Sequence, residues 1–164
     1  MELKNLKIGL RTFKTGLSVF ICILLFQLIG RGSPIIAGIT AVFAMREDVG
    51  TSVKFGLQRI SGNIIGAVFA VIMLFLLQIT QDAFLIRLFF IPGFLMLVIT
   101  ICNATNSKDG IVGASATYLA ILYIAPADNA VYFSLNRVLD AFIGAGISLL
   151  INYFIRNPQK NGPN

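Results

Sequence analysis

The chain has 164 residues, of which 57% are apolar and only 12% are charged, and its mean hydropathy is +0.86. Soluble domains contain about 45–50% apolar and about 25% charged residues, so this composition excludes an ordinary soluble domain and favours a membrane protein. The chain has no histidine, and its two cysteines, Cys22 and Cys102, lie far apart inside apolar stretches, which also excludes a His/Cys metal site and a Cys–His nucleophile.

The charges narrow the possible functions further. The net charge of +6 does not indicate nucleic-acid binding, because the basic residues are scattered between the apolar stretches and are not gathered with aromatic residues on one face. No segment reads G-x-x-x-x-G-K-S/T, the loop that holds the phosphates of ATP. We therefore expect neither an enzyme nor a bound metal or cofactor.

Residues 1–14 are predicted to form an amphipathic segment at the membrane surface. Leu3, Leu6 and Leu10 recur at helical spacing, and Lys7 and Arg11 recur beside them. This pattern suits a helix lying on an anionic leaflet before the chain enters the membrane. An ordinary basic flank next to the first span explains the same residues equally well.

Six long apolar stretches follow, separated by charged residues. A helix that crosses a hydrocarbon core of about 30 Å needs about 20 residues. Five stretches satisfy this or come close, whereas Gly32–Met45 is short and begins with Ser33-Pro34, so it is either a half-helix or a span extended through Arg46. The predicted fold class is an all-α membrane bundle with six transmembrane helices in residues 15–156, followed by a short tail, residues 157–164. In chain order the stretches are Thr15–Gly30, Gly32–Met45, Ile60–Gln81, Leu88–Ser107, Gly110–Ala127 and Val138–Ile155.

The basic residues predict the orientation of these spans. Ten lysines and arginines fall in the N-terminal segment, the tail and the loops after the second and fourth spans, whereas the opposite loops carry only Arg31, Arg87 and Arg137. Because Lys and Arg accumulate on the cytoplasmic side, both termini are predicted to be cytoplasmic, which requires an even number of spans. The first span lacks an A-x-A-like cleavage site, so we expect it to be retained in the plasma membrane.

An internal repeat relates the two halves of the chain. Shifting the sequence by 78 residues aligns residues 55–67 with residues 133–145, and six of the thirteen positions are identical, among them Arg59 with Arg137 and Gly66 with Gly144. We interpret residues of about 15–79 and about 88–155 as two repeats of three helices. An odd number of spans in each repeat gives them opposite orientations, which is the plan of many secondary transporters, whose substrate path lies at the interface between the repeats.

Small residues predict which helix faces pack. Gly62 and Gly66 stand one turn apart, and their repeat partners are Asp140 and Gly144, followed by Ser148 one turn later. We predict helix packing at Gly62, Gly66, Gly144 and Ser148, because small residues let backbones approach closely in membranes.

Asp140 is the one charged residue inside a predicted span, and it replaces a glycine of the first repeat on this packing face. An intramembrane carboxylate normally faces a protein interior or a watery cavity, so Asp140 is our candidate for proton coupling. An alternative is that Asp140 lies near the outer interface and pairs with Arg137, which is about one helical turn away.

Arg59, Arg137 and Asn63 are the candidates for binding a substrate anion. A guanidinium can hold a carboxylate with two hydrogen bonds, and each arginine opens the third span of its repeat. Asn63 adjoins the Gly62/Gly66 face. Alternatively, the arginines mark the membrane boundary and Asn63 joins neighbouring helices by hydrogen bonds.

The two copies of the repeated segment resemble a known family. The run from Ser33-Pro34 to Met45, the segment from Gly56 to Ala67, and the second copy, residues 137–145, which reads R-x-x-G/D-x-x-x-G, resemble the membrane domain of the aromatic acid exporter family, also called fusaric-acid-resistance-like transporters. The resemblance covers roughly residues 5–156. It implies a bacterial inner-membrane protein that exports aromatic carboxylates with the proton gradient. Many relatives carry a soluble C-terminal domain or a second membrane half, so we expect this chain to work as a homo-oligomer.

Two functional hypotheses therefore stand. The first is a transporter that exports small organic anions across the lipid bilayer. The second is a non-transporting membrane interaction or accessory subunit, in which the glycine faces serve only helix association with a larger partner.

Overall fold

Apolar stretches joined by short turns fold into helices in the computed structural model, which describes residues 9–80, 84–126 and 129–155. Within these ranges the chain forms six α-helices, one short 3-10 turn and no strand, which confirms the all-α prediction. The elements are α1 (Leu10–Leu28), α2 (Ile35–Ala44), α3 (Val49–Ile79), α4 (Phe84–Ala104), the 3-10 turn η2 (Lys108–Gly110), α5 (Ile111–Ile124) and α6 (Ala130–Phe154).

Four of the six helices, α1, α3, α4 and α6, are long and apolar enough to cross a membrane. Of the six predicted spans, these four are thus shown as candidates, and the other two helices, α2 and α5, are shorter. With a rise of about 1.5 Å per residue, the 10 residues of α2 and the 14 of α5 reach about 15 and about 21 Å, short of the core of about 30 Å. Both end where the backbone turns extended, α2 at Met45 (ψ 115°) and α5 at Ala125 (ψ 135°). Ala125 precedes Pro126, whose ring disfavours a helical residue before it.

The helix α3 begins well before the predicted third span. Arg59 was expected to open that span, but the 31-residue helix starts at Val49 and incorporates Lys54 and Arg59. The expectation failed because it placed boundaries at charged residues, whereas the helix starts after the Asp48 cap and runs through them. Arg137 likewise lies about two turns inside α6.

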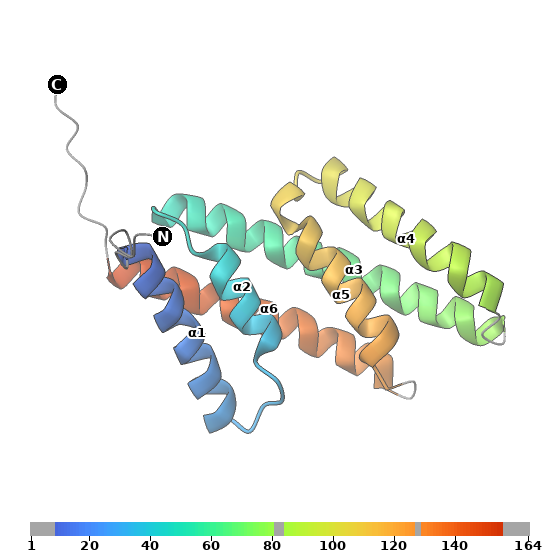
Figure 1. The fold of residues 1–164 in the computed structure, drawn as a ribbon, viewed down its shortest axis with the longest axis horizontal. Helices are drawn as coiled ribbons and strands as arrows, with labels where there is room; N and C mark the ends of the chain where they lie inside the picture. Colours follow the sequence, from blue (N-terminus) through green and yellow to red (C-terminus); the bar gives the residue numbers. More distant parts are fainter. Residues whose placement is uncertain (1–8, 81–83, 127–128, 156–164) are drawn as a thin grey trace, which may run out of the picture.

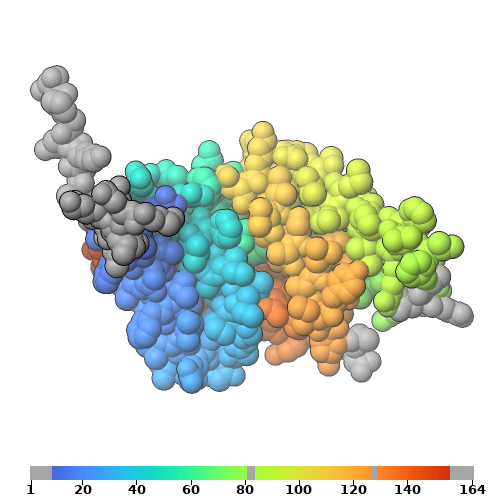
Figure 2. Space-filling view, in the orientation of Figure 1, coloured from blue at the N-terminus to red at the C-terminus, as the bar shows by residue number. Residues whose placement is uncertain are grey.

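The described residues form two apolar cores. Figure 1 shows the arrangement of the helices that build them. One core is built by α1, α2 and α6, with Phe26, Ala37 and Ile147 among its members. The other is built by the C-terminal half of α3 with α4 and α5, and includes Met73 and Tyr118. The long helices α3 and α6 also pack against each other and join the two cores. Figure 2 shows α1 and α2 side by side at one end of the molecule and α4 at the other.

Two predicted segments fall wholly or largely outside the described residues. The tail, residues 157–164, lies outside them, as do residues 1–8 of the predicted surface segment. Residues 10–14 of that segment form the first turn of α1, where Phe13 is exposed and Lys14 is buried.

Candidate functional site

The start of α3 fixes the position of Arg59 along the helix. Asp48 caps the helix, since its Oδ1 accepts a hydrogen bond of 2.7 Å from the backbone N–H of Thr51. Hydrogen bonds from Thr51 hold the pKa of Asp48 below its ordinary value of 3.8. A carboxylate suits this position because the first N–H groups of a helix lack partners within the helix. With the start fixed at Val49, Arg59 falls about three turns along α3.

Three helices enclose the Arg59 side chain, which is only 2% exposed. Its Cζ lies 4.3 Å from the ring centroid of Phe43 on α2, a distance typical of a cation–π contact. Gly113 of α5 also lies against this side chain. A Cβ added to Gly113 would come within 3.0 Å of Cζ, so the guanidinium occupies the space that the glycine leaves empty.

Asn63 follows Arg59 by one turn of α3 and faces the same glycine of α5. A Cβ at Gly113 would come within 2.8 Å of Asn63 Oδ1. The amide is 2% exposed, and its Oδ1 accepts a hydrogen bond of 3.0 Å from Thr117 Oγ1. The structure therefore brings together two of the three residues predicted to bind an anion.

Two of the hydrogen-bond donors of the Arg59 guanidinium are unused in the part of the chain that the structure describes. Among the described residues, its buried Nε and Nη1 have no hydrogen-bond partner, and the hydroxyls of Thr40 and Ser148 are likewise buried without one. A buried cation without a counter-charge costs several kcal/mol. A guanidinium that retains unpaired N–H donors can bind a carboxylate, and Phe43 supplies an aromatic surface next to it.

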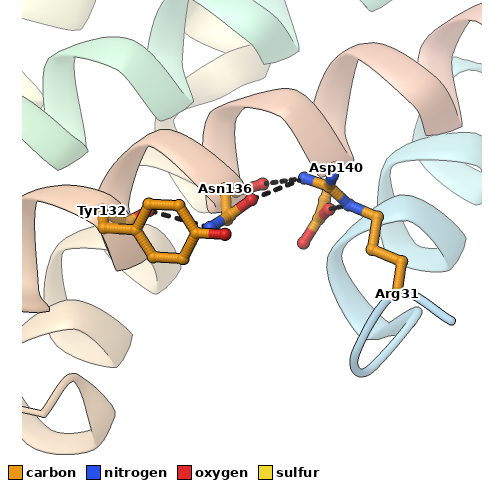
Figure 3. Close-up of polar contacts among 4 residues, drawn as sticks. All are labelled: Arg31, Tyr132, Asn136 and Asp140. Carbon is orange, nitrogen blue, oxygen red and sulfur yellow. Dashed lines mark hydrogen bonds and ion pairs between the residues drawn. The ribbon is translucent and has the colours of Figure 1, made fainter.

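Asp140 lies in an ion pair at another place in the fold (Figure 3). Its Oδ1 accepts a hydrogen bond of 2.7 Å from Nε of Arg31, in the turn between α1 and α2. Nη2 of Arg31 donates to Asn136 Oδ1 at 3.0 Å, and the Asn136 amide donates to the backbone oxygen of Tyr132. Arg31 thus ties the turn after α1 to the N-terminal half of α6.

The backbone at the C-terminus of α1 positions Arg31 for this ion pair. Gly30 adopts a φ of 62°, and its N–H donates to Gln27 O while the N–H of Arg31 donates to Phe26 O. These two bonds form a Schellman motif, which reverses the chain after a helix.

The alternative that pairs Asp140 with Arg137 is wrong. The Arg137 guanidinium instead lies 4.5 Å from the ring centroid of Phe133, one turn earlier on α6. Arg137 is half-buried and separate from the Arg59 cluster. The sequence could not identify the true partner, because Arg31 is 109 positions from Asp140.

A third polar cluster joins the two ends of the described chain. Lys14, 1% exposed, donates from Nζ to Asn152 Oδ1 at 3.0 Å. The Asn152 amide donates to Ser52 Oγ at 2.8 Å and to the backbone oxygen of Arg46 at 3.2 Å. This cluster fixes the first turn of α1 and the last turn of α6 against the start of α3. Sequence reasoning had assigned Lys14 to the membrane surface and missed the cluster.

The four predicted packing residues lie between helices. Gly62 faces the backbone of Gly110 in the turn η2, and Gly66 faces the backbone of Ala114 in α5. Gly144 faces the backbone of α2 at Ala37. In each case an added Cβ would overlap a backbone carbonyl. Ser148, one turn after Gly144, is fully buried.

In the described ranges no three His, Cys, Asp or Glu side chains come together as metal ligands. The distinctive groups are buried cations, of which Arg59 and Lys14 are the most enclosed.

Comparison with protein families identifies the chain. Residues 6–155 match the family described as "Aromatic acid exporter family member 1". The chain belongs to the aromatic acid exporter family. This match confirms the resemblance found from the two repeated segments. The match extends over almost the whole described bundle. The family is of exporter type.

Curated relatives of this exporter family member are UPF0421 proteins of bacteria. One from Oceanobacillus iheyensis is 30% identical over 163 residues, covering 98% of this chain and 44% of the relative. YgaE of Bacillus subtilis is 32% identical over 160 residues, covering 94% and 41%. One from Staphylococcus saprophyticus is 34% identical over 154 residues, covering 93% and 44%. The chain spans less than half the length of these relatives, and no solved structure matches it.

Proposed function

We propose that the protein is a membrane transporter that exports small organic anions, such as aromatic carboxylic acids, and that Arg59 binds the carboxylate. The observation that carries this proposal is an arginine side chain only 2% exposed, whose buried Nε and Nη1 have no hydrogen-bond partner in the described part of the chain. Arginine stays protonated in proteins, so the charge is permanent. An anion that enters the site gains charge-assisted hydrogen bonding from these donors and neutralises a costly buried charge.

The neighbours of Arg59 favour an aromatic acid over other anions. Phe43 lies against the guanidinium, and Asn63 and Thr117 provide polar groups one turn further along. A flat ring can stack on Phe43 while its carboxylate reaches Arg59. Membership in an exporter family and four apolar helices of spanning length support transport as the activity.

Proton coupling is proposed to act through Asp140. Protonation of Asp140 would remove the negative charge that holds Arg31, and would release the turn between α1 and α2 from α6. The Asp140→Asn variant imitates the protonated state. We expect it to transport at a rate that no longer depends on the proton gradient, whereas wild-type flux falls when the gradient is collapsed.

The arrangement of the cores supports the proposed inverted repeat. The third helix of each proposed repeat packs in the core of the other one, since α6 joins α1 and α2 while α3 joins α4 and α5. The aligned glycines Gly66 and Gly144 make equivalent contacts with α5 and α2. The helices α1 and α4 are also each followed by a residue with positive φ, Gly30 and Asn106.

We further propose that both termini are cytoplasmic, in a bacterial inner membrane. The first turn of α1 and the last turn of α6 meet through Lys14 and Asn152, so the two ends of the described chain lie on the same side of the bundle. The excess of basic residues in the loops assigned to that side supports a cytoplasmic location. Labelling of cysteines introduced near each end, in intact cells with an impermeant maleimide, tests this orientation.

Transport in proteoliposomes tests the proposed function. We expect wild-type protein to move radiolabelled benzoate and Arg59→Gln to lose at least tenfold of that flux. Because Arg59→Gln removes a buried unpaired charge, the variant should unfold at the same or a higher temperature than wild type. The matched control is Arg137→Gln, which should retain flux. Equal flux in wild type and Arg59→Gln would refute the role of Arg59.

A further inference from the structure

An apolar groove runs between α1 and α2 on the outside of the bundle. Its volume is about 410 Å³, within the range of about 300–1,000 Å³ that is typical of small-ligand pockets. Val19 and Ile23 of α1 form one wall, and the face of α2 from Pro34 to Phe43 forms the other. No charged side chain lines the groove, so it can accept only the apolar part of a ligand.

Phe43 borders both this groove and the buried charge of Arg59. It is one of the residues that line the groove, and its ring centroid lies 4.3 Å from the Arg59 Cζ. Phe43 is 43% exposed, whereas Arg59 is 2% exposed. A change of the Phe43 side chain to another rotamer would therefore open a route from the groove to the unpaired Nε and Nη1 of Arg59.

We propose that the groove between α1 and α2 is the port through which an aromatic carboxylate reaches Arg59 directly from the lipid bilayer, with Phe43 as its gate. This inference rests on the proposed function. The aromatic ring of the substrate occupies the apolar groove, and the carboxylate replaces the Phe43 ring in front of the guanidinium. The port selects flat amphipathic acids, since its walls exclude charge and its inner end requires an anion.

The charge at the inner end decides between possible occupants of the groove. A lipid acyl chain fills apolar space but leaves the Arg59 donors unpaired. A second copy of the chain packed over α1 and α2 would close the groove and block the route. An aromatic acid matches both the apolar walls and the cation behind Phe43, so we commit to that occupant.

Filling the groove with a side chain tests the port. A Cβ added to Gly38 meets only Val19 Cγ1 at 3.9 Å, an ordinary contact, so a larger side chain at this position can fold and extends into the groove. Gly38→Phe is the test variant, and Gly38→Leu is a smaller version in case the first does not fold. The matched control is Gly146→Phe, because a Cβ at Gly146 meets nothing within 4 Å.

The first readout is photolabelling with 4-benzoylbenzoate, an aromatic carboxylate, in proteoliposomes. We expect the label on peptides of α1 and α2, competed by benzoate, at least tenfold weaker in Gly38→Phe and unchanged in Gly146→Phe. Label found instead along the groove of α3 and α6, lined by Val71 and Leu135, would overturn the proposal. Labelling of α1 and α2 by a photoreactive phospholipid that benzoate does not displace would also overturn it. A loss of oligomers in Gly38→Phe with unchanged benzoylbenzoate labelling would do the same.

The second readout is benzoate transport. We expect KM to rise about tenfold in Gly38→Phe, with Gly146→Phe near wild type. If Gly38→Phe transports normally while Arg59→Gln is inactive, the port is refuted and the proposed function stands. If Arg59→Gln also transports normally, the proposed function itself fails.

Discussion

The ion pair between Asp140 and Arg31 holds the turn after α1 on α6, and its strength can be measured. The two residues are 109 positions apart, and their contact is a hydrogen bond of 2.7 Å between Nε and Oδ1. The change Asp140→Asn keeps the shape of the side chain and removes its charge. The change Arg31→Gln removes the cation and also the hydrogen bond to Asn136.

The burial of the pair sets the expected magnitude. Hydrogen bonds to charged groups contribute about 1.5–3 kcal/mol when they are enclosed, and exposed ion pairs contribute about 0.2–1 kcal/mol. The Asp140 side chain is 8% exposed and the Arg31 side chain is 26% exposed, so water screens one partner only in part. We therefore expect a coupling energy between these limits, about 1–2 kcal/mol.

A double-mutant cycle isolates this coupling from other effects of each substitution. The free energy of unfolding is measured for wild type, both single variants and the double variant, by SDS titration in mixed micelles followed by circular dichroism. The matched control is a second cycle between Asp140 and Arg137, because the Arg137 guanidinium lies on Phe133. We expect less than about 0.5 kcal/mol of coupling in the control. Equal coupling in both cycles, or none between Asp140 and Arg31, would refute the assigned ion pair.

Two further predictions concern helix packing and the start of α3. Gly66→Leu should lower the free energy of unfolding by about 1–3 kcal/mol, because its Cβ overlaps the carbonyl of Ala114, whereas Gly146→Leu should change it by less than about 0.5 kcal/mol in the same SDS titration. The pKa of Asp48 is lowered in the folded state by hydrogen bonds from Thr51, so its stabilising effect is fully present above about pH 4 and is lost as the pH falls through the folded-state pKa. We expect Asp48→Asn, which still caps the helix, to lose less stability than wild type when thermal unfolding is compared at about pH 6 and about pH 3. An identical pH dependence in both proteins would contradict this role of the cap.

Local patterns in the sequence were sufficient to predict the helical fold class. Long apolar stretches dictate helices in a membrane because every backbone polar group must be paired within its own segment. Helix lengths were harder to predict. The charges at Arg46 and Arg59 were taken as boundaries, whereas the cap at Asp48 starts a single helix that runs past Arg59. Conversely, α5 is shorter than its apolar stretch because Pro126 follows it.

The candidate site was predictable in composition but not in its contacts. Residue type and position next to the Gly62/Gly66 face were enough to select Arg59 and Asn63. These two residues lie together in the structure. Their neighbours Phe43 and Gly113 come from α2 and α5, and no local pattern indicates which helices will meet. The same limit applies to Lys14, whose partner Asn152 is 138 positions away. A basic residue next to an apolar stretch is usually a surface anchor, and only the packed fold reveals that Lys14 is enclosed.

Equilibrium binding of an aromatic carboxylate tests the central claim most directly, because it depends on the Arg59 site alone and on no assumption about energy coupling. Radiolabelled benzoate is titrated against purified protein in detergent, with wild type compared with Arg59→Gln and Arg137→Gln. We predict saturable binding to wild type and Arg137→Gln, and an affinity at least tenfold weaker in Arg59→Gln, a loss of about 1.4 kcal/mol or more. Equal affinity in wild type and Arg59→Gln would contradict the assignment of Arg59 as the anion-binding group.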